Sequence, residues 1–267
     1  GVISCSKMNI LEKIIAHKHK EVDAQQKIIP LDRLKKSQRL FAVRDFKNAL
    51  KGEDIQIIAE IKRQSPTEKD IYPNADPAEV AKSFKSNGAA ALSVLTDSHF
   101  FGGHLDFIQK VKTVVDLPIL RKDFIVSEYQ VWESFHKGAD AILLIADAID
   151  FNLLSALYSL ASELGMHVLI ETHSARHLDN IISLKPEIVG INCRNLQTME
   201  TNLEWFETVL YKLPSDCVKV AESGIKTPDN LNYISQIGYD AALVGTSLMK
   251  TSIPGIALAE LLQRVPA

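Results

Sequence analysis

Charged side chains close three short apolar runs of this sequence, and acid–base chemistry could be placed there. A carboxylate or an ammonium group on a buried strand is costly unless it is paired or faces a wet cavity. In such a cavity these groups could move protons during catalysis. The candidate residues are Glu60 and Lys62 at the end of run 57–61, Lys122 after run 117–121, and Glu171 at the end of run 167–171.

The first run, Ile57-Ile58-Ala59-Glu60-Ile61, has a pattern that separates two faces. Side chains alternate along a strand, so Glu60 and Lys62 share one face with Ile58, whereas Ile57 and Ile61 lie on the other. An edge strand with a solvated charged face is the simpler reading of this run alone. Because charge recurs at the ends of three runs, we favour a site that these residues share. Burial disfavours the charged form of a lysine, so we expect a lowered pKa for Lys122 in this site.

A phosphate site is predicted by two small-residue pairs late in the chain. Ser223-Gly224 and Gly245-Thr246 follow the last two apolar runs. Loops of this kind bind phosphate through backbone N–H groups, although such glycines can also simply form tight turns. Lys62 and Arg194 would add the positive charge that a doubly anionic ligand needs. Asn192 and Glu222 complete the set of polar residues at the ends of the runs.

Composition excludes several classes of protein. The net charge of -3 gives no electrostatic reason to expect binding to nucleic acid or to an acidic membrane. The three cysteines, Cys5, Cys193 and Cys217, show no metal-ligand spacing and indicate a reducing compartment. Without a signal peptide or a long apolar run, the expected location is the cytoplasm. We expect no metal, and of the histidines His173 is the best placed to line a site.

The elements that must position these residues form a regular alternation. Helical patterns with side-chain caps, such as Asp76-Pro77, Asp150 and Thr227-Pro228, separate the apolar runs. Strands that alternate with helices predict a parallel sheet, and eight such repeats fit a closed (β/α)8 TIM barrel. An open doubly wound sheet is the alternative, but no GxGxxG follows the first run. The eight runs are 57–61, 90–95, 117–121, 140–145, 167–171, 187–191, 218–221 and 241–244.

The first part of the chain precedes this alternation. An apolar stripe containing Ile10, Leu11 and Ile14, with Asn9 as a candidate N-cap, predicts a helix from residue 9 to about residue 27. Short helical segments are expected near 31–34 and 46–50, and a final helix from Pro254 to Arg264. We therefore expect one α/β domain in which a helical extension, 1–50, precedes the barrel, 51–267.

Several motifs of this chain resemble those of indole-3-glycerol phosphate synthase and occur in the same order. The likeness extends from about residue 9 to the end of the chain. Barrels that merely bind phosphate share only the glycine loops, so the resemblance is specific. The motifs are Ile58-Ala59-Glu60-Ile61-Lys62 with Ser65-Pro66, Ser93-Val94-Leu95-Thr96-Asp97, Lys122-Asp123-Phe124, Gly190-Ile191-Asn192 with Arg194, Glu222-Ser223-Gly224-Ile225, and Gly245 followed by Ser247-Leu248-Met249.

This resemblance implies a carboxy-lyase of tryptophan biosynthesis that needs no cofactor and binds a small phosphorylated substrate. The substrate would be 1-(2-carboxyphenylamino)-1-deoxyribulose 5-phosphate. Ring closure followed by loss of carbon dioxide and water would yield indole-3-glycerol phosphate. We expect such an enzyme to act as a monomer.

The resemblance also assigns roles to individual residues. Lys122 matches the general acid that protonates the ketone oxygen, and Glu171 matches a second acid–base group used in dehydration. Arg194 would face the anthranilate carboxylate. The remaining assignments are Glu60 and Lys62 as catalytic or orienting residues, Asn192 and Glu222 as partners of the substrate nitrogen and hydroxyls, Ser65, Ser223, Gly224, Gly245 and Thr246 around the phosphate, and Phe101 and Phe124 against the aromatic ring.

Two departures from the family pattern leave the proposed catalytic residues untouched. After Ser65-Pro66 the family usually has a second Ser and then a Gly, whereas this chain continues Thr67-Glu68-Lys69-Asp70. We expect this loop to act as a lid that is stiffer than usual. Cys193 replaces the usual Asn or Ser and should point away from the site as a small apolar residue. Two alternatives stay open: a Schiff-base lyase that uses Lys62 or Lys122, and a phosphate-binding relative without catalysis.

Overall fold

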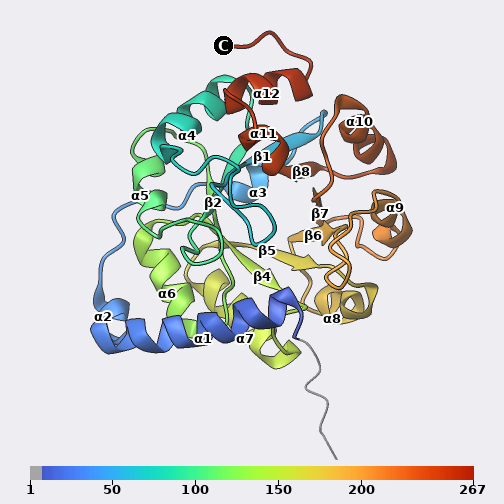
Figure 1. Cartoon of the computed structure of the whole chain (residues 1–267). Helices are drawn as coiled ribbons and strands as arrows, with labels where there is room; N and C mark the ends of the chain where they lie inside the picture. The colour runs from blue at the N-terminus through green and yellow to red at the C-terminus, as the bar shows by residue number, and fades with distance from the viewer. Residues whose placement is uncertain (1–7) are drawn as a thin grey trace, which may run out of the picture.

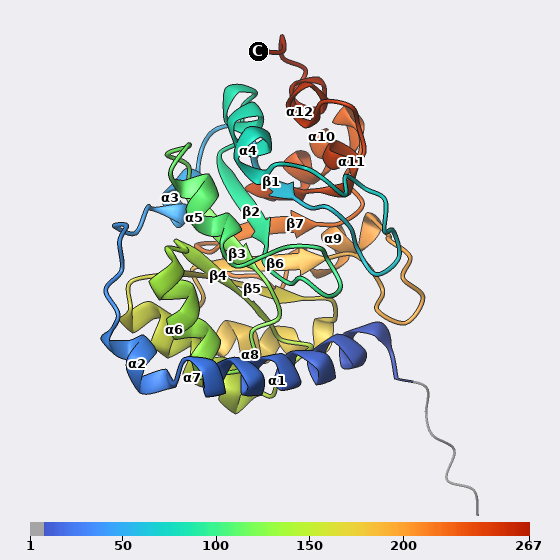
Figure 2. The same ribbon diagram turned by 60° about the vertical axis from the view of Figure 1, so that its left-hand side comes forward.

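A computed structural model describes residues 8–267, and its centre is a closed barrel of eight parallel strands. Each strand pairs with the next one along the chain, and β1 pairs with β8 to close the ring. Figures 1 and 2 show the strands at the centre with helices around them. The (β/α)8 prediction is therefore confirmed. The strands are β1 (Gln56–Ile61), β2 (Ala91–Leu95), β3 (Ile119–Lys122), β4 (Ala141–Ile145), β5 (His167–Thr172), β6 (Ile188–Asn192), β7 (Val218–Glu222) and β8 (Ala241–Val244).

Helices follow the strands and cover the outside of the barrel. They are α4 (Pro77–Ser86), α5 (Phe107–Lys112), α6 (Glu128–Lys137), α7 (Phe151–Glu163), the short η1 (Ala175–His177) with α8 (Leu178–Ser183), α9 (Glu204–Leu210), α10 (Pro228–Ile237), α11 (Thr246–Met249) and α12 (Pro254–Leu261). Predicted caps begin three of them. Asp76, Asp150 and Thr227 each accept a hydrogen bond from a backbone N–H of the first turn. The last helix ends at Leu261, three residues before the predicted Arg264.

Alternate residues of each strand serve two separate apolar cores. In β4, Leu143 points into the barrel, whereas Ile142 and Leu144 pack under the helices. In β1, Ile58 lies inside the barrel, and Ile57 lies in the outer core. This alternation places Glu60 and Lys62 on the inner side, above Ile58, as the sequence pattern predicts. Both side chains therefore emerge inside the ring, toward its carboxyl end.

The N-terminal segment contacts the barrel at both ends. It comprises α1 (Ile10–Ile28), α2 (Leu31–Lys36) and α3 (Phe46–Ala49). Asn9 caps α1, as predicted, and Glu12 completes a reciprocal capping box that was not predicted. Phe46 and Leu50 are fully buried in the inner core with Ile58, so they close the base of the barrel. In both views α1 lies along the outside of the barrel, beside α6 (Figures 1 and 2).

In the part of the chain that the structure describes, none of the helices combines the length and apolar character that crossing a membrane requires.

Candidate active site

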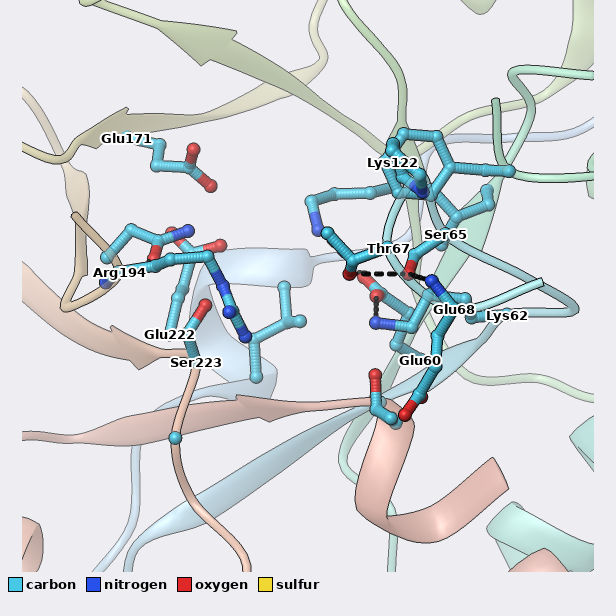
Figure 3. Close-up of a pocket in the computed structure, with 18 of the residues that line it drawn as sticks. Glu60, Lys62, Ser65, Thr67, Glu68, Lys122, Glu171, Arg194, Glu222 and Ser223 are labelled. Carbon is cyan, nitrogen blue, oxygen red and sulfur yellow. Dashed lines mark hydrogen bonds and ion pairs between the residues drawn. The ribbon is translucent and has the colours of Figure 1, made fainter. Parts of the chain in front are cut away.

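A cavity of about 550 Å³ opens at the carboxyl ends of the strands, where active sites of this fold lie. Figure 3 shows Glu171, Arg194, Glu222 and Ser223 on one side of it and Glu60, Lys62, Ser65 and Lys122 on the other. The structure brings together all fourteen side chains or glycines selected from the sequence. The residues that line the cavity include Glu60, Lys62, Ser65, Phe101, Lys122, Phe124, Glu171, Asn192, Arg194, Glu222, Ser223, Gly224, Gly245 and Thr246.

Glu60 is the centre of a hydrogen-bonded cluster on one side of the cavity. Its Oε2 accepts hydrogen bonds from Lys122 Nζ at 2.9 Å and from Ser93 Oγ at 2.8 Å. Its Oε1 lies 3.4 Å from Lys62 Nζ. Burial alone would raise the pKa of Glu60, but the two ammonium groups lower it, so the carboxylate is ionised near neutral pH. Ser93 belongs to a quoted motif, but its role in orienting Glu60 was not predicted.

The two lysines beside Glu60 differ in pKa, and the prediction of a lowered pKa for Lys122 is wrong. Burial acts in the predicted direction, but the charges of Glu60, Glu222 and Glu171 outweigh it and raise the pKa of Lys122. Lys62 is the lysine whose pKa is lowered, because burial and the charge of Lys122 oppose its single partner, Glu60. Lys122 therefore carries its proton at neutral pH, and its raised pKa means that it holds this proton more tightly than a free lysine does.

Glu171 and Glu222 form a second pair on the opposite side. Both are buried, and neither Glu222 oxygen nor Glu171 Oε1 has a donor among the partners in the described chain. Burial and the neighbouring charge of Glu171 raise the pKa of Glu222 well above its usual value. A protonated Glu222 is itself a donor and can hydrogen bond to Glu171. Two carboxyl groups this close favour a single shared proton, and the raised pKa of Glu222 favours its place on Glu222.

Gly190 makes room for this pair, a role that the sequence analysis did not predict although Gly190 belongs to one of the family motifs. A Cβ atom at Gly190 would lie 2.2 Å from Glu222 Oε2. No side chain other than hydrogen fits there while Glu222 keeps its position. The signal in the sequence was a glycine inside β6, because a strand glycine often marks a close approach by a neighbouring group.

The predicted phosphate loops follow the adjacent strands β7 and β8 and line the same cavity, and Ser247 Oγ of one donates to the Ile225 carbonyl of the other at 3.2 Å. Ser223 and Gly224 have φ values of 72° and 76°, so two successive residues adopt the left-handed conformation. A non-glycine residue there is uncommon and signals a local functional constraint. Gly245 lies against the Glu60–Lys62 pair, since a Cβ atom would be 2.9 Å from Glu60 Oε1 and 3.2 Å from Lys62 Nζ. The first turn of α11 follows Gly245. Leu248 and Met249 donate their N–H groups to the Gly245 carbonyl oxygen, so the N–H groups of Thr246 and Ser247 are those left at the start of the helix.

Arg194 and Asn192 form the third polar edge. The Arg194 guanidinium donates through Nη1 to the Met199 carbonyl at 2.6 Å, which fixes the side chain beside the cavity. Asn192 Oδ1 accepts the backbone N–H of Arg194 at 3.0 Å, so its amide nitrogen is the group left for a ligand. Cys193 is buried in the outer core between them, pointing away from the site as predicted.

Aromatic and apolar side chains enclose the cavity from above. The rings of Phe101 and Phe124 have centroids 5.8 Å apart and form one wall. Ile10, Leu11 and Ile14 of α1 line the same cavity. An apolar wall is thus present beside charged groups, which suits an aromatic ligand that carries anionic substituents.

The loop between β1 and α4 borders the entrance. Ser65 and Glu68 exchange backbone hydrogen bonds of 2.7 Å and 3.2 Å, which close a short turn. This turn forms without the glycine that the family usually has in the loop. Glu68 also forms an ion pair of 2.7 Å with Lys250, just after α11. Lys250 and Lys226 line the cavity and add positive charge near the phosphate loops, and neither was predicted. Within residues 8–267, no group of three or more His, Cys, Asp or Glu side chains could hold a metal ion.

Solved structures with similar folds are TIM-barrel proteins of low sequence identity. A 3-hexulose-6-phosphate synthase from Salmonella typhimurium has a TM-score of 0.63 at 11% identity and covers 78% of this chain and 97% of its own. A thiamine phosphate pyrophosphorylase from Pyrococcus furiosus has a TM-score of 0.57 at 14% identity and covers 82% of this chain and 96% of its own. At these identities the likeness shows the fold alone.

Sequence relatives are much closer. The sequence model of the indole-3-glycerol phosphate synthase family matches residues 11–261. Indole-3-glycerol phosphate synthase from Bacteroides thetaiotaomicron is 43% identical over 258 residues, which is 96% of this chain and 99% of the relative. The protein of the same name from Laribacter hongkongensis is 42% identical over 95% of this chain and 98% of its own length. The chain therefore belongs to the indole-3-glycerol phosphate synthase family.

Proposed function

We propose that the protein converts 1-(2-carboxyphenylamino)-1-deoxyribulose 5-phosphate to indole-3-glycerol phosphate. The observation that carries the proposal is the position of Lys122. Its ammonium group bonds to Glu60 at 2.9 Å and lies in the same cavity as Glu171, Glu222 and the glycine loops. A charged proton donor, two further carboxyl groups and an anion site are the parts that this reaction needs.

Lys122 acts as the general acid of ring closure. Attack of the aromatic carbon on the ketone leaves negative charge on the ketone oxygen, and a nearby ammonium group can neutralise it by giving a proton. Glu60 orients Lys122, because its carboxylate accepts a hydrogen bond from the lysine. The carboxylate of the ring then leaves as carbon dioxide, which restores the aromatic system.

Glu171 acts in the second half of the reaction, where a hydroxyl leaves as water and the adjacent carbon loses a proton. An ionised carboxylate can accept that proton, and the low pKa of Glu171, about 2, keeps it ionised. The lowered pKa of Lys62 suits a group that gives its proton to the departing hydroxyl. Asn192 and the protonated Glu222 hold the substrate hydroxyls or nitrogen.

The substrate lies across the cavity with its phosphate at one end and its ring at the other. Backbone N–H groups around Ser223, Gly224, Gly245 and Thr246 bind the phosphate together with Ser65. Arg194 faces the anthranilate carboxylate, for which a guanidinium is well suited. Phe101 and Phe124 contact the ring. We further propose that the enzyme works in the cytoplasm, as a monomer and without a cofactor.

The test is formation of an indole product by the purified protein. Incubation with the carboxyphenylamino-deoxyribulose phosphate should yield a product with indole fluorescence, with carbon dioxide and water released, and chelator treatment should not change the rate. The lowered pKa of Lys62 favours one competing reaction, a Schiff-base lyase. Trapping of substrate on the protein by borohydride, without indole formation, would replace the synthase proposal with that alternative.

A further inference from the structure

His173 contacts Glu171 but has no part in the reaction as described. It follows β5 directly, and its side chain is only 10% exposed. Its Nε2 lies 3.0 Å from Glu171 Oε2, and its Nδ1 lies 2.8 Å from the backbone carbonyl oxygen of Arg194. Both ring nitrogens are thus engaged by oxygen atoms, and one of those oxygens belongs to a proposed catalytic base.

The partner of Nδ1 decides where the protons of this ring lie. A carbonyl oxygen can only accept a hydrogen bond, so Nδ1 must carry a hydrogen. In a neutral ring Nε2 would then hold a lone pair, which would face the lone pairs of an ionised Glu171 at 3.0 Å. That arrangement is repulsive. One proton must therefore lie between His173 Nε2 and Glu171 Oε2, held by either group.

We propose that His173 is a positioning residue that carries this proton as an imidazolium and thereby keeps Glu171 ionised, with Oε1 as its reactive oxygen. The inference rests on the proposed role of Glu171 as a base. Oε2 is occupied by His173, whereas Oε1 has no donor among its described neighbours apart from a protonated Glu222. His173 thus holds the carboxylate through Oε2, and Oε1 is the oxygen left for the substrate.

Charged groups on the neighbouring strands favour the same distribution of protons. Asp147, after β4, accepts the backbone N–H of His173 at 2.9 Å and adds negative charge near the ring. Burial would lower the pKa of His173, but its hydrogen bond with Glu171 and the charge of that residue raise it. On the other side of Glu171, the positive charge of Lys122 of β3 also lowers its pKa, and the raised pKa of Glu222 of β7 favours the neutral form of that neighbour. His173 supplies the largest contribution that lowers the pKa of Glu171.

The first experiment observes the ring itself in the free enzyme, without any turnover. Nitrogen-15 NMR of the histidine side chains should show both nitrogens of His173 protonated at pH 7.5, well above the usual histidine pKa of about 6.5. In Glu171→Gln the His173 resonances should change toward those of a neutral ring at this pH. A His173 ring that is neutral at pH 7.5 in the wild type, with only Nδ1 protonated, would overturn the proposal.

The second experiment measures how the rate depends on pH. His173→Ala removes the cation, so the pKa of buried Glu171 should rise, and the acidic limb of kcat should move to higher pH by about 1–2 units, the size expected for loss of a charge-assisted hydrogen bond. KM should change little, because His173 does not need to touch the substrate. His173→Lys, which can restore a cation, should recover part of the shift.

His167 provides the matched control, because it begins the same strand at the base of the barrel, where it lies 3.6 Å from Asp45. His167→Ala should leave the pH profile unchanged. A His173→Ala profile that superimposes on the wild type would refute the positioning role. Protonation of both ring nitrogens in a wild type that forms no indole product would instead leave the His173–Glu171 pair intact and overturn the proposed reaction.

Discussion

Lys18 of α1 places its ammonium group 2.7 Å from Asp97 Oδ1 and 2.9 Å from Asp123 Oδ1, and all three side chains are buried. Asp97 Oδ2 accepts the backbone N–H of Phe101 at 3.2 Å, and Asp123 separates Lys122 from Phe124 in the chain. The N-terminal helix is therefore tied by charge to the loops that carry the aromatic wall and the proposed general acid.

Replacing Lys18 with Met should strongly destabilise the protein. The change leaves two buried carboxylates without their shared cation, and breaking a buried ion pair in this way costs about 3–5 kcal/mol. The free energy of unfolding in urea should fall by that amount. Lys20→Met is the control, because Lys20 lies on the same helix but is exposed, and its effect should be small. A Lys18→Met protein as stable as the control would show that the network contributes little.

Lys122→Arg should separate charge from proton transfer. Arginine keeps the positive charge beside Glu60 but almost never releases a proton. Since general acid catalysis contributes about 10²- to 10⁴-fold, kcat should fall by that order while substrate binding changes modestly. Single-turnover kinetics, with product binding measured separately, would check this. Lys219→Arg serves as the control, because Lys219 lies near the start of β7, at the opposite end of the barrel from the site, and this change should leave kcat unaltered. Retention of most of the ring-closure rate in Lys122→Arg would shift the search for the acid to Lys62 or Glu171.

Glu222→Gln should change how stability depends on pH. The pKa of Glu222 is raised in the folded protein, so above its ordinary value of 4.5 the unfolded chain releases the proton first. The free energy of unfolding of the wild type should therefore decrease as pH rises from about 4.5 toward the folded pKa, by about 1.4 kcal/mol per pH unit from this group. Glutamine cannot ionise, so the free energy of unfolding of the variant should increase relative to that of the wild type as pH rises over that range.

Urea unfolding of both proteins at pH 5 and pH 8 measures this difference. Glu163→Gln, at an exposed position at the end of α7, should follow the wild type at both pH values. A constant difference between Glu222→Gln and the wild type across this range would mean that Glu222 is already ionised in the fold.

Gly245→Ala should weaken phosphate binding. The added methyl group would press on Glu60 and Lys62, at 2.9 Å and 3.2 Å from the polar atoms of those residues, and would narrow access to the backbone of α11. Loss of one hydrogen bond to a charged ligand corresponds to roughly a tenfold or larger rise in KM. Inhibition by inorganic phosphate should weaken in parallel. Gly52→Ala, which lies before β1 at the base of the barrel, should change neither KM nor inhibition by inorganic phosphate. An unchanged KM in folded Gly245→Ala would locate the phosphate elsewhere.

Glu68→Gln should alter the motion of the loop between β1 and α4. The change breaks the ion pair with Lys250 and frees that cation at the cavity entrance. We expect a lower KM at low ionic strength, because an anion near the phosphate is removed, and a changed viscosity dependence of kcat. Lys69→Gln, at an exposed position of the same loop, serves as the control. Identical kinetics in Glu68→Gln and the wild type at both low and high salt would argue against a lid role.

The sequence by itself determined the barrel and the polar residues at the strand ends that line the cavity. Apolar runs ending in Glu60, Lys122 or Glu171 place polar groups at strand ends, and a closed parallel sheet brings all strand ends to one edge. The two-residue period of a strand also indicated that Glu60 and Lys62 share a face with Ile58, which the structure places inside the barrel. These features follow from local pattern, so they can be predicted without knowing any contact across the barrel.

Only the tertiary structure decided which charges pair and how strongly. Lys122 bonds to Glu60 across 62 positions of sequence and meets two further carboxyl groups, which reverses the pKa shift that burial alone predicts. Lys18, on a helix that looks like an ordinary amphipathic surface element, is buried against Asp97, 79 positions away. Electrostatic energy depends on distances between groups that are far apart in the chain, and strand periodicity carries no information about those distances.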